Sequence, residues 1–342
     1  MRSRKALSFD DVLLVPGYSS VESRREIDIS VNGKGFNTPL NMPIVSAPMD
    51  SITEASMATA IDTVGGLGIV HRYNTIDHQT QIVHECYVAG AKNIGAAIGV
   101  TGDYRERADS LVKAGANVIC VDIAHGHHAL MKACLEVLRL DHGDSIHIMA
   151  GNVATLEGFN DLSDWGADSI RVGIGGGSIC STRIQTGHGV PTLQSVLDCS
   201  RTDRDALLIA DGGIKNSGDM VKALAAGADL LMCGSLLSGT DETPGQVIQS
   251  ADGRMRKVYR GMASREAQKS WRNSVGSVEG IATTVDVKGS APDVLMNLAW
   301  GIKSGLSYSG AINLSDFRSK ANFIEQTQAG AKESSTHILR VN

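Results

Sequence analysis

A short run of glycines surrounds one cysteine at residues 173–183, GIGGGSICSTR. Glycines let the backbone approach a ligand closely, because they carry no side chain and tolerate unusual backbone angles. A thiol in such a loop becomes a nucleophile when a nearby cation favours its thiolate form, so Cys180 is a candidate nucleophile and Arg183 a candidate cation. The alternative is an inert packed thiol, since cysteine behaves as a small hydrophobic residue.

The glycine run matches neither of the common phosphate-binding fingerprints. No Gly-Lys-Ser/Thr follows it, as a P-loop requires. The third glycine of a dinucleotide-binding fingerprint would fall at Ser178, and no helix is expected to open there. The chemistry therefore has to come from Cys180 and its neighbours.

The remaining five cysteines lie in apolar or helical patterns: Cys86, Cys120, Cys134, Cys199 and Cys233. None forms a Cys-x-x-Cys pair, and the spacing predicts neither a zinc site nor a disulfide framework. Free thiols are typical of a reducing compartment, so we expect a cytoplasmic protein.

Three histidines follow one apolar run, in the segment DIAHGHH: His125, His127 and His128. A zinc site needs several converging ligands, and no cysteine or carboxylate cluster stands at ligand spacing. We expect these histidines to be exposed to solvent or to cap a helix, with zinc binding as the alternative.

The overall composition is that of an ordinary globular chain. It has 342 residues, 42% hydrophobic and 20% charged, with a formal net charge of −5. Such a surface does not favour nucleic acid or an anionic membrane as partner. The basic start of the chain meets Asp10 and Asp11 before any long apolar stretch, which argues against a signal peptide. No apolar run approaches the ~20 residues that cross a bilayer.

Eight short apolar runs bounded by turn residues recur along the chain: 42–49, 66–72, 93–100, 117–126, 146–153, 169–175, 206–213 and 229–237. They are nearly continuous in Val, Ile, Leu and Ala, as strands buried on both faces should be. Segments with helical periodicity lie between them, the clearest at 53–65, 77–91, 105–116 and 217–228. Several end in glycine, which ends a helix in the left-handed conformation. We predict an α/β fold, a (β/α)₈ barrel that forms a single domain over residues 1–342; a doubly wound open sheet is the alternative.

Barrel active sites lie at the C-terminal ends of the strands, and the unusual residues of this chain fall there. Two glycine-containing segments follow the seventh and eighth runs, where such barrels commonly bind phosphate: Asp211-Gly212-Gly213 and Gly234-Ser235. Tight turns without a ligand are the alternative, because glycine punctuates loops everywhere.

A polar, basic excursion at about 250–290 follows the eighth run. It is expected to be either a solvated loop or a mobile lid that meets an anionic nucleotide. Residues 293–306 then predict the closing helix, followed by a polar C-terminal tail.

At the cysteine loop the sequence resembles the family of IMP dehydrogenases and GMP reductases. The similarity continues through much of the chain, at 7–19, 46–58, 151–153, 210–229 and 259–264. The resemblance implies a purine nucleotide bound at the barrel mouth, a nicotinamide cofactor and, as is usual in the family, a homotetramer. Cys180 matches the nucleophile that forms a covalent thioimidate at purine C2.

The resemblance also implies roles for further residues. It implies contacts with the substrate's ribose, phosphate and base from Ser178, Asp211, Gly212, Gly213, Gly234, Ser235, Tyr259, Gly261, Met262 and Gly280. It implies contacts with the cofactor from Arg72, Asp122 and Asn152. The backbone carbonyls of Gly175, Gly177 and Cys180, with the tail, match the family's monovalent-cation (K⁺) site.

The two family activities differ in one step. The dehydrogenase hydrolyses the covalent adduct, using an Arg-Tyr pair on a long mobile flap; the reductase expels ammonia from GMP and takes hydride from NADPH. The reductase relies on a threonine and a glutamate, which match Thr182 and Glu279. Only 16 residues separate Met262 from Glu279, and they hold no tyrosine. The chain also lacks the CBS pair that most dehydrogenases insert after the second strand. We therefore expect a GMP reductase.

Other segments, at 46–50, 124–128 and 328–337, resemble bacterial dehydrogenases more than reductases. The chain also departs from the family pattern: Arg72 stands where reductases usually have lysine, Gly176 replaces a common proline, and Thr192 replaces a usual glutamine. An IMP dehydrogenase that uses NAD and has a shortened flap is thus the alternative. A nucleotide-binding regulator without catalysis and an unrelated flavin barrel are further alternatives.

Overall fold

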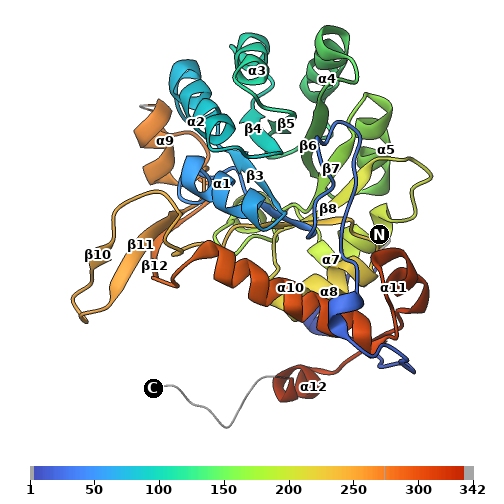
Figure 1. Ribbon diagram of the computed structural model, residues 1–342. Coiled ribbons are helices and arrows are strands. Elements are labelled where there is room, and N and C mark those ends of the chain that lie inside the picture. Colours follow the sequence, from blue (N-terminus) through green and yellow to red (C-terminus); the bar gives the residue numbers. More distant parts are fainter. Residues whose placement is uncertain (1–3, 273, 335–342) are drawn as a thin grey trace.

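Eight parallel strands close into a barrel in the computed structural model, which describes residues 4–272 and 274–334 (Figure 1). The barrel strands, in order around the ring, are β2 (Ile44–Ser46), β3 (Leu67–Val70), β4 (Ile94–Ile98), β5 (Val118–Asp122), β6 (His147–Val153), β7 (Ser169–Val172), β8 (Leu207–Asp211) and β9 (Leu230–Cys233). Each lies within one of the eight apolar runs, so the predicted (β/α)₈ barrel is confirmed. The strands are almost entirely buried, which explains why both of their faces are apolar.

Helices cover the outside of the barrel (Figure 1). They are α1 (Ala55–Thr63), α2 (Ile76–Val88), α3 (Tyr104–Lys113), α4 (Ala129–His142), α5 (Leu156–Asp164), α7 (Thr192–Cys199), α8 (Ser217–Ala225) and α10 (Ala291–Tyr308). Side-chain caps start several of them, as where Thr75 accepts from the backbone N–H of His78 at the start of α2. The connection between β3 and α2 is only residues 71–75, so no domain is inserted after the second barrel strand.

Glycines turn the chain from helix to strand at the predicted places. Gly90, Gly115, Gly166 and Gly227 have φ between 86° and 118°, in the region that favours glycine. Each follows an alanine or tryptophan at the end of α2, α3, α5 or α8. This recurrent turn keeps the βα units short and brings the strand ends into one layer.

The two ends of the chain pair with each other, which the sequence did not suggest. β1 (Val12–Leu14), after the short helix η1 (Phe9–Asp11), runs antiparallel to β13 (Phe323–Glu325). The short helices η2 (Arg24–Glu26), α11 (Leu314–Lys320) and α12 (Gln328–Glu333) complete these segments.

The basic excursion is more ordered than a solvated loop. It forms an antiparallel sheet of β10 (Ile248–Gln249), β11 (Met255–Arg260) and β12 (Ala282–Asp286), with α9 (Arg265–Arg272) between the last two strands. The alternative of an irregular loop was wrong, because β11 and β12 satisfy each other's backbone groups over five residue pairs, although many of their side chains are exposed.

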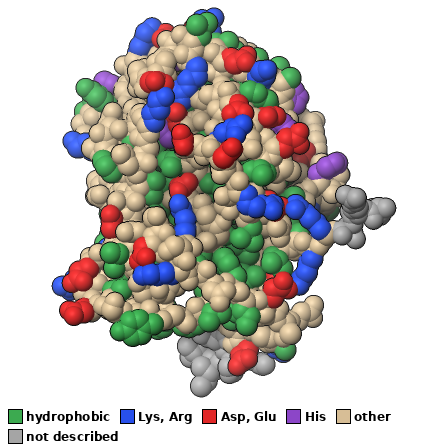
Figure 2. Space-filling view, turned by 90° about the vertical axis from the view of Figure 1, so that its right-hand side faces the viewer, with side chains coloured by type: hydrophobic (Ala, Val, Ile, Leu, Met, Phe, Trp, Pro, Cys, Tyr) green, Lys and Arg blue, Asp and Glu red, His purple; other side chains and the backbone are tan. Residues whose placement is uncertain are grey.

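The surface mixes charges of both signs. Figure 2 shows Lys and Arg interspersed with Asp and Glu over the upper part of one face, and a run of Lys and Arg side chains right of its middle. Among the described residues, no helix combines the length and apolar character needed to cross a bilayer.

Candidate active site

A cavity of about 590 Å³ opens at the C-terminal ends of the barrel strands. Every site residue implied by the family resemblance lines it: Cys180, Thr182, Glu279, Ser178, Asp211, Gly212, Gly213, Gly234, Ser235, Tyr259, Gly261, Met262, Gly280, Arg72, Asp122, Asn152, Gly175 and Gly177. These residues come from positions 72 to 280 of the chain, so the fold gathers them into one site.

Cys180 lies in the loop between β7 and the short helix α6 (Thr182–Thr186). Its thiol donates to Thr182 Oγ1 at 3.2 Å, and its side chain is partly exposed to the cavity. The expected cation is not there, because the Arg183 guanidinium donates to the carbonyl of Val190 at 2.7 Å instead. The nearest polar partner of the thiol is therefore the hydroxyl of Thr182.

The other five cysteines are buried. Burial raises the pKa of Cys86 to about 11, and of Cys120, Cys134, Cys199 and Cys233 to about 12. These thiols stay protonated near neutral pH and pack as hydrophobic residues. Cys180 alone of the six faces the cavity.

Glu279 reaches the cysteine loop through backbone pairing. The N–H of Ser181 donates to the Glu279 carbonyl at 2.9 Å, and the N–H of Ile281 donates to the Ile179 carbonyl at 3.0 Å. Cys180 and Gly280 thereby form an isolated antiparallel bridge. The Glu279 carboxylate accepts from the Ser277 hydroxyl at 3.2 Å and lines the cavity. The excursion thus carries an acidic group to the rim of the nucleophile loop.

Arg171 connects the two carboxylates on the floor of the cavity. Its guanidinium donates to Asp122 and, at 3.0 Å, to Asp211 Oδ2, which also accepts from the Asn152 amide at 2.8 Å. Burial opposes the charge on Arg171, but Asp211 and Asp122 outweigh burial and raise the pKa of the guanidinium. The sequence analysis missed this residue, although an arginine inside the apolar strand SIRV was a signal that could have found it.

Hydroxyl groups and closely packed glycines surround the expected phosphate cradle. The hydroxyls of Ser178 and Tyr259 lie 3.5 Å apart, and burial raises the pKa of Tyr259, which keeps it a neutral hydrogen-bond donor. Gly212 has φ of 93°, and a Cβ there would lie 3.0 Å from the backbone nitrogen of Gly177. The close approach of these two loops therefore requires glycine at position 212.

Two departures from the family pattern lie next to each other. A Cβ on Gly176 would stand 2.3 Å from Thr192 Oγ1, so Thr192 fills the space that a larger residue at 176 would need. The Thr192 side chain is buried, and its hydroxyl has no hydrogen-bond partner among the described residues. The changes at 176 and 192 therefore fit one another.

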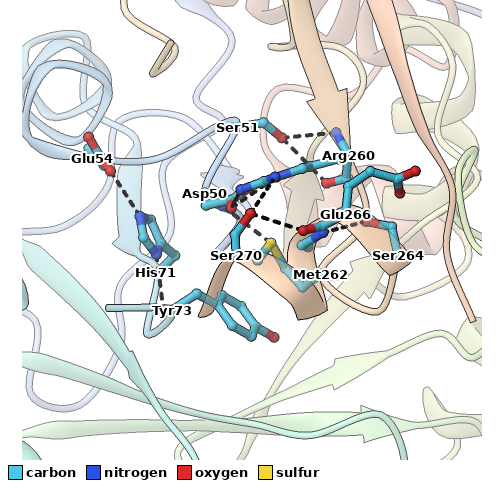
Figure 3. Close-up of polar contacts among 11 residues, drawn as sticks. Asp50, Ser51, Glu54, His71, Tyr73, Arg260, Met262, Ser264, Glu266 and Ser270 are labelled. Carbon is cyan, nitrogen blue, oxygen red and sulfur yellow. Dashed lines mark hydrogen bonds and ion pairs between the residues drawn. The ribbon is translucent and has the colours of Figure 1, made fainter. Parts of the chain in front are cut away.

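One side of the cavity is fixed to the barrel by a polar cluster (Figure 3). Arg260, at the end of β11, donates to Asp50 Oδ2 at 3.1 Å and to the Ser270 hydroxyl in α9 at 3.2 Å. The backbone N–H of Asp50 approaches Met262 Sδ at 3.4 Å. These contacts hold the excursion and the expected base-contacting residue Met262 against the loop after β2.

Aromatic residues that the sequence analysis did not single out complete this side. Tyr73 and Trp271 meet edge to face with their ring centres 4.8 Å apart, and both line the cavity. The backbone N–H of Tyr73 donates to His71 Nδ1 at 3.2 Å, and His71 Nε2 lies 3.0 Å from Glu54 (Figure 3). Trp271 is one of three tryptophans in the chain. Its segment was notable in the sequence only for its basic charge and its lack of tyrosine, so the contact of Trp271 with Tyr73 was not expected.

The three histidines after β5 do not converge on a metal. His128 accepts from the N–H of Leu130 at the start of α4, which confirms its expected capping role, and His127 pairs with Asp161 at 2.8 Å. Burial lowers the pKa of His125. Across residues 4–272 and 274–334, no group of three or more His, Cys, Asp or Glu side chains is placed to hold a metal ion.

The expected cation carbonyls lie in the cysteine loop, where that of Gly177 also accepts from the N–H of Cys180 at 3.1 Å. The expected contribution of the tail falls partly on residues 335–337, which lie outside the described residues. The cation site stays a prediction.

Comparison with known proteins gives consistent matches. The family model "IMP dehydrogenase / GMP reductase domain" matches residues 6–337. The inosine-5'-monophosphate dehydrogenase of Nitrosopumilus maritimus is 33% identical over 474 residues, covering 98% of this chain and 99% of the relative. The GMP reductase of Leishmania major is 43% identical over 259 residues, covering 72% of this chain and 52% of the relative.

A solved structure is similar over nearly the full chain. It is a cysteine-to-alanine variant of GMP reductase from Trypanosoma brucei in complex with guanosine 5'-monophosphate, with a TM-score of 0.92 and 29% identity. The match covers 98% of each chain.

Proposed function

The chain belongs to the IMP dehydrogenase / GMP reductase family, and from that premise we propose that it is a GMP reductase, which converts GMP and NADPH to IMP and ammonia. The observation that carries the proposal is the short segment between Met262 and Glu279. The segment contains α9 and no tyrosine. The chain that follows α9 brings Glu279 beside the cysteine loop. The segment offers no Arg-Tyr pair to activate water for hydrolysis.

The nucleotide would bind across the strand ends. Ser178, Tyr259 and the backbone at Gly213 and Gly234 offer donors for a 5'-phosphate, and Asp211 offers a carboxylate for ribose hydroxyls. Asp211 is oriented by Arg171 and Asn152. The relative crystallised with GMP supports this class of ligand.

The reaction begins at Cys180. Its sulfur forms a bond to purine C2, the bond from C2 to the amino nitrogen breaks, and ammonia leaves. In the resting state the hydroxyl of Thr182 accepts a hydrogen bond from the thiol at 3.2 Å. Glu279 is the acidic group that lines the cavity beside the cysteine loop. We assign these two residues the proton transfers to the departing nitrogen. C2 of the thioimidate then accepts hydride, and the bond between C2 and the Cys180 sulfur breaks, which gives IMP.

The cavity has room and partners for a nicotinamide cofactor. Arg72 lies next to the rings of Tyr73 and Trp271 and 3.7 Å from Asp122, and we assign Arg72 and Asp122, with Asn152, to the cofactor. When bound, NADPH supplies hydride at purine C2. The protein's part is to hold the reacting atoms together and to exclude water, so that the thioimidate is reduced and not hydrolysed.

The test is turnover by the purified protein. GMP with NADPH should give a falling nicotinamide absorbance and one ammonia for each NADPH consumed. Cys180→Ala, measured beside it, should show neither signal. No turnover with GMP would overturn the proposal.

A second candidate, IMP dehydrogenase, is favoured by the relatives of that name that match over their whole length. It requires a water-activating group in place of the Arg-Tyr pair. Formation of NADH and XMP from IMP and NAD would establish it.

A further inference from the structure

Two arginines on the cavity wall have no hydrogen-bond acceptor among residues 4–272 and 274–334. Arg72 and Arg272 both line the cavity, yet neither guanidinium donates a hydrogen bond to any described residue. The closest carboxylate to Arg72 is Asp122, at 3.7 Å from Nε. By contrast, Arg171, which lines the same cavity, and Arg260, which precedes the lining residue Gly261, donate to carboxylates. Arg72 is partly buried and its buried Nε has no acceptor, which is costly, whereas Arg272 is exposed and lines the cavity with its donors free to meet a ligand.

Aromatic rings hold these two arginines in place. The Arg72 guanidinium lies 4.9 Å from the ring centre of Tyr73 and 5.9 Å from that of Trp271. The Arg272 guanidinium lies 4.2 Å from the centre of the Trp271 ring. Stacking on a ring orients a guanidinium without using its N–H groups, which remain available to a ligand. We call Arg72, Tyr73, Trp271 and Arg272 the arginine–aromatic cluster.

The cluster is anchored from two directions, as Figure 3 shows for its neighbours. Tyr73 is fixed through His71 and Glu54, and α9, which carries Trp271 and Arg272, is fixed through the contact of Ser270 with Arg260. The ring and both charges are thus set before any ligand arrives, and preorganisation of this kind favours binding.

The position of the cluster identifies the ligand group. Both guanidinium distances refer to the same Trp271 ring, so the two guanidinium carbons lie at most about 10 Å apart. Arg72 is next to Asp122, on the side proposed for nicotinamide, and the phosphate cradle for GMP is formed separately by the loops after β7, β8 and β9. A second anion with several acceptor oxygens, one ribose away from the nicotinamide, is the pyrophosphate of the dinucleotide.

We propose that the arginine–aromatic cluster binds the pyrophosphate of the nicotinamide dinucleotide, with Arg272 as its main phosphate ligand and Trp271 packing beside it. The inference rests on the proposed function only in taking a nicotinamide dinucleotide as second ligand, and it holds for NAD as for NADPH. It assigns Tyr73, Trp271 and Arg272 a binding role that neither the motifs nor the family resemblance gave them.

The experiment measures binding without turnover, so it is independent of the reaction catalysed. In a Trp165→Phe/Trp300→Phe background, Trp271 is the remaining tryptophan, and its fluorescence is followed while ADP-ribose is added. ADP-ribose contains the pyrophosphate and no nicotinamide. We expect saturable quenching, and Arg272→Gln should raise Kd about tenfold, as for loss of a charge-assisted contact. Arg272→Lys should keep part of the affinity.

The control is Arg254→Gln, which removes an exposed arginine of the excursion that does not line the cavity. It should leave Kd unchanged. A parallel titration with 2'-phospho-ADP-ribose tests whether Arg272 contacts the pyrophosphate or the 2'-phosphate. If it contacts the pyrophosphate, Arg272→Gln should weaken the binding of both ligands by the same factor. Loss confined to the 2'-phosphorylated ligand would mean that Arg272 contacts the 2'-phosphate and would overturn the assignment. So would absence of quenching, or an Arg272→Gln variant with unchanged Kd for both ligands.

Discussion

Two walls of the cavity differ in how they are built. The barrel wall consists of the strand ends and loops after β7, β8 and β9, with Cys180, Asp211 and Ser235. The excursion wall consists of residues 255–272 and 274–286, with Met262, Trp271 and Glu279, and is attached to the barrel by side-chain and backbone contacts. Under the proposed function, the barrel wall holds what both family activities need, the nucleophile and the nucleotide. The excursion wall would then determine whether the thioimidate is reduced or hydrolysed, so the proposed choice of reaction depends on the part of the site that is not part of the barrel.

The largest effect is expected on the barrel wall, from Cys180→Ala. Loss of the attacking sulfur should reduce GMP turnover by at least about 10⁴-fold, since the covalent step has no substitute. The melting temperature should stay close to that of the wild type because Cys180 is partly exposed. Alkylation by iodoacetamide at neutral pH, located by mass spectrometry, should label Cys180 ahead of the buried Cys120 and Cys134. Retained turnover would contradict the covalent mechanism.

A second large effect should appear in stability, from Arg171→Met. The substitution leaves Asp122 and Asp211 without their shared cation, and breaking such a buried network costs about 3–5 kcal/mol of unfolding free energy. The control Arg204→Met removes an arginine that pairs with Asp164 and Asp203 at the surface, where little change is expected. Urea unfolding of both variants makes the comparison. Equal stability of the two would show that Arg171 does not support the barrel wall.

On the excursion wall, Glu279→Gln should lower kcat for GMP reduction by about 10²-fold, the usual size of a lost general acid or base. Nucleotide binding should persist, because the backbone bridge to the cysteine loop does not involve the side chain. Ser277→Ala, which removes only the hydroxyl that donates to Glu279, is the matched control and should cost far less. A Glu279→Gln variant with full kcat would exclude the proton-transfer role.

A smaller effect is expected where the excursion wall joins the barrel. Arg260→Gln removes the link between Asp50 and Ser270, and the KM for the cofactor should rise about fivefold while the fold persists, as for a positioning residue. Arg260→Lys should restore only part of the loss, because it cannot reach both partners. If steady-state kinetics show no change in KM, the excursion is held by its backbone contacts alone.

The smallest effect concerns pH. The hydrogen bond from His71 lowers the pKa of Glu54, so the folded state holds this proton less tightly than the unfolded chain does. The stabilisation is present above the usual carboxyl range near pH 4.5 and is lost as pH falls through the lower pKa of the folded state. Thermal melts should show the wild type losing its small advantage over Glu54→Gln below about pH 4.5. A constant difference across pH 3.5–7 would show that the pair does not stabilise the position of Tyr73.

The same contrast separates what the sequence could predict from what it could not. The barrel strands and the strand ends that line the cavity follow from apolar runs and glycine turns, which are local signals, and Cys180 and Asp211 were found in this way. The excursion depends on contacts between distant residues, such as Arg260 with Asp50 and Tyr73 with Trp271. No local pattern marks such pairs. Arg183 illustrates the limit: adjacent in sequence to Thr182, it directs its guanidinium to Val190 and away from the thiol.

The two activities can be compared on a single preparation by measuring kcat/KM for GMP with NADPH and for IMP with NAD, and by identifying the nucleotide products. We predict that GMP gives IMP and ammonia and that IMP with NAD gives no sustained release of XMP, because the excursion wall has no Arg-Tyr pair to activate water. Sustained formation of XMP and NADH, with no turnover of GMP, would contradict this prediction.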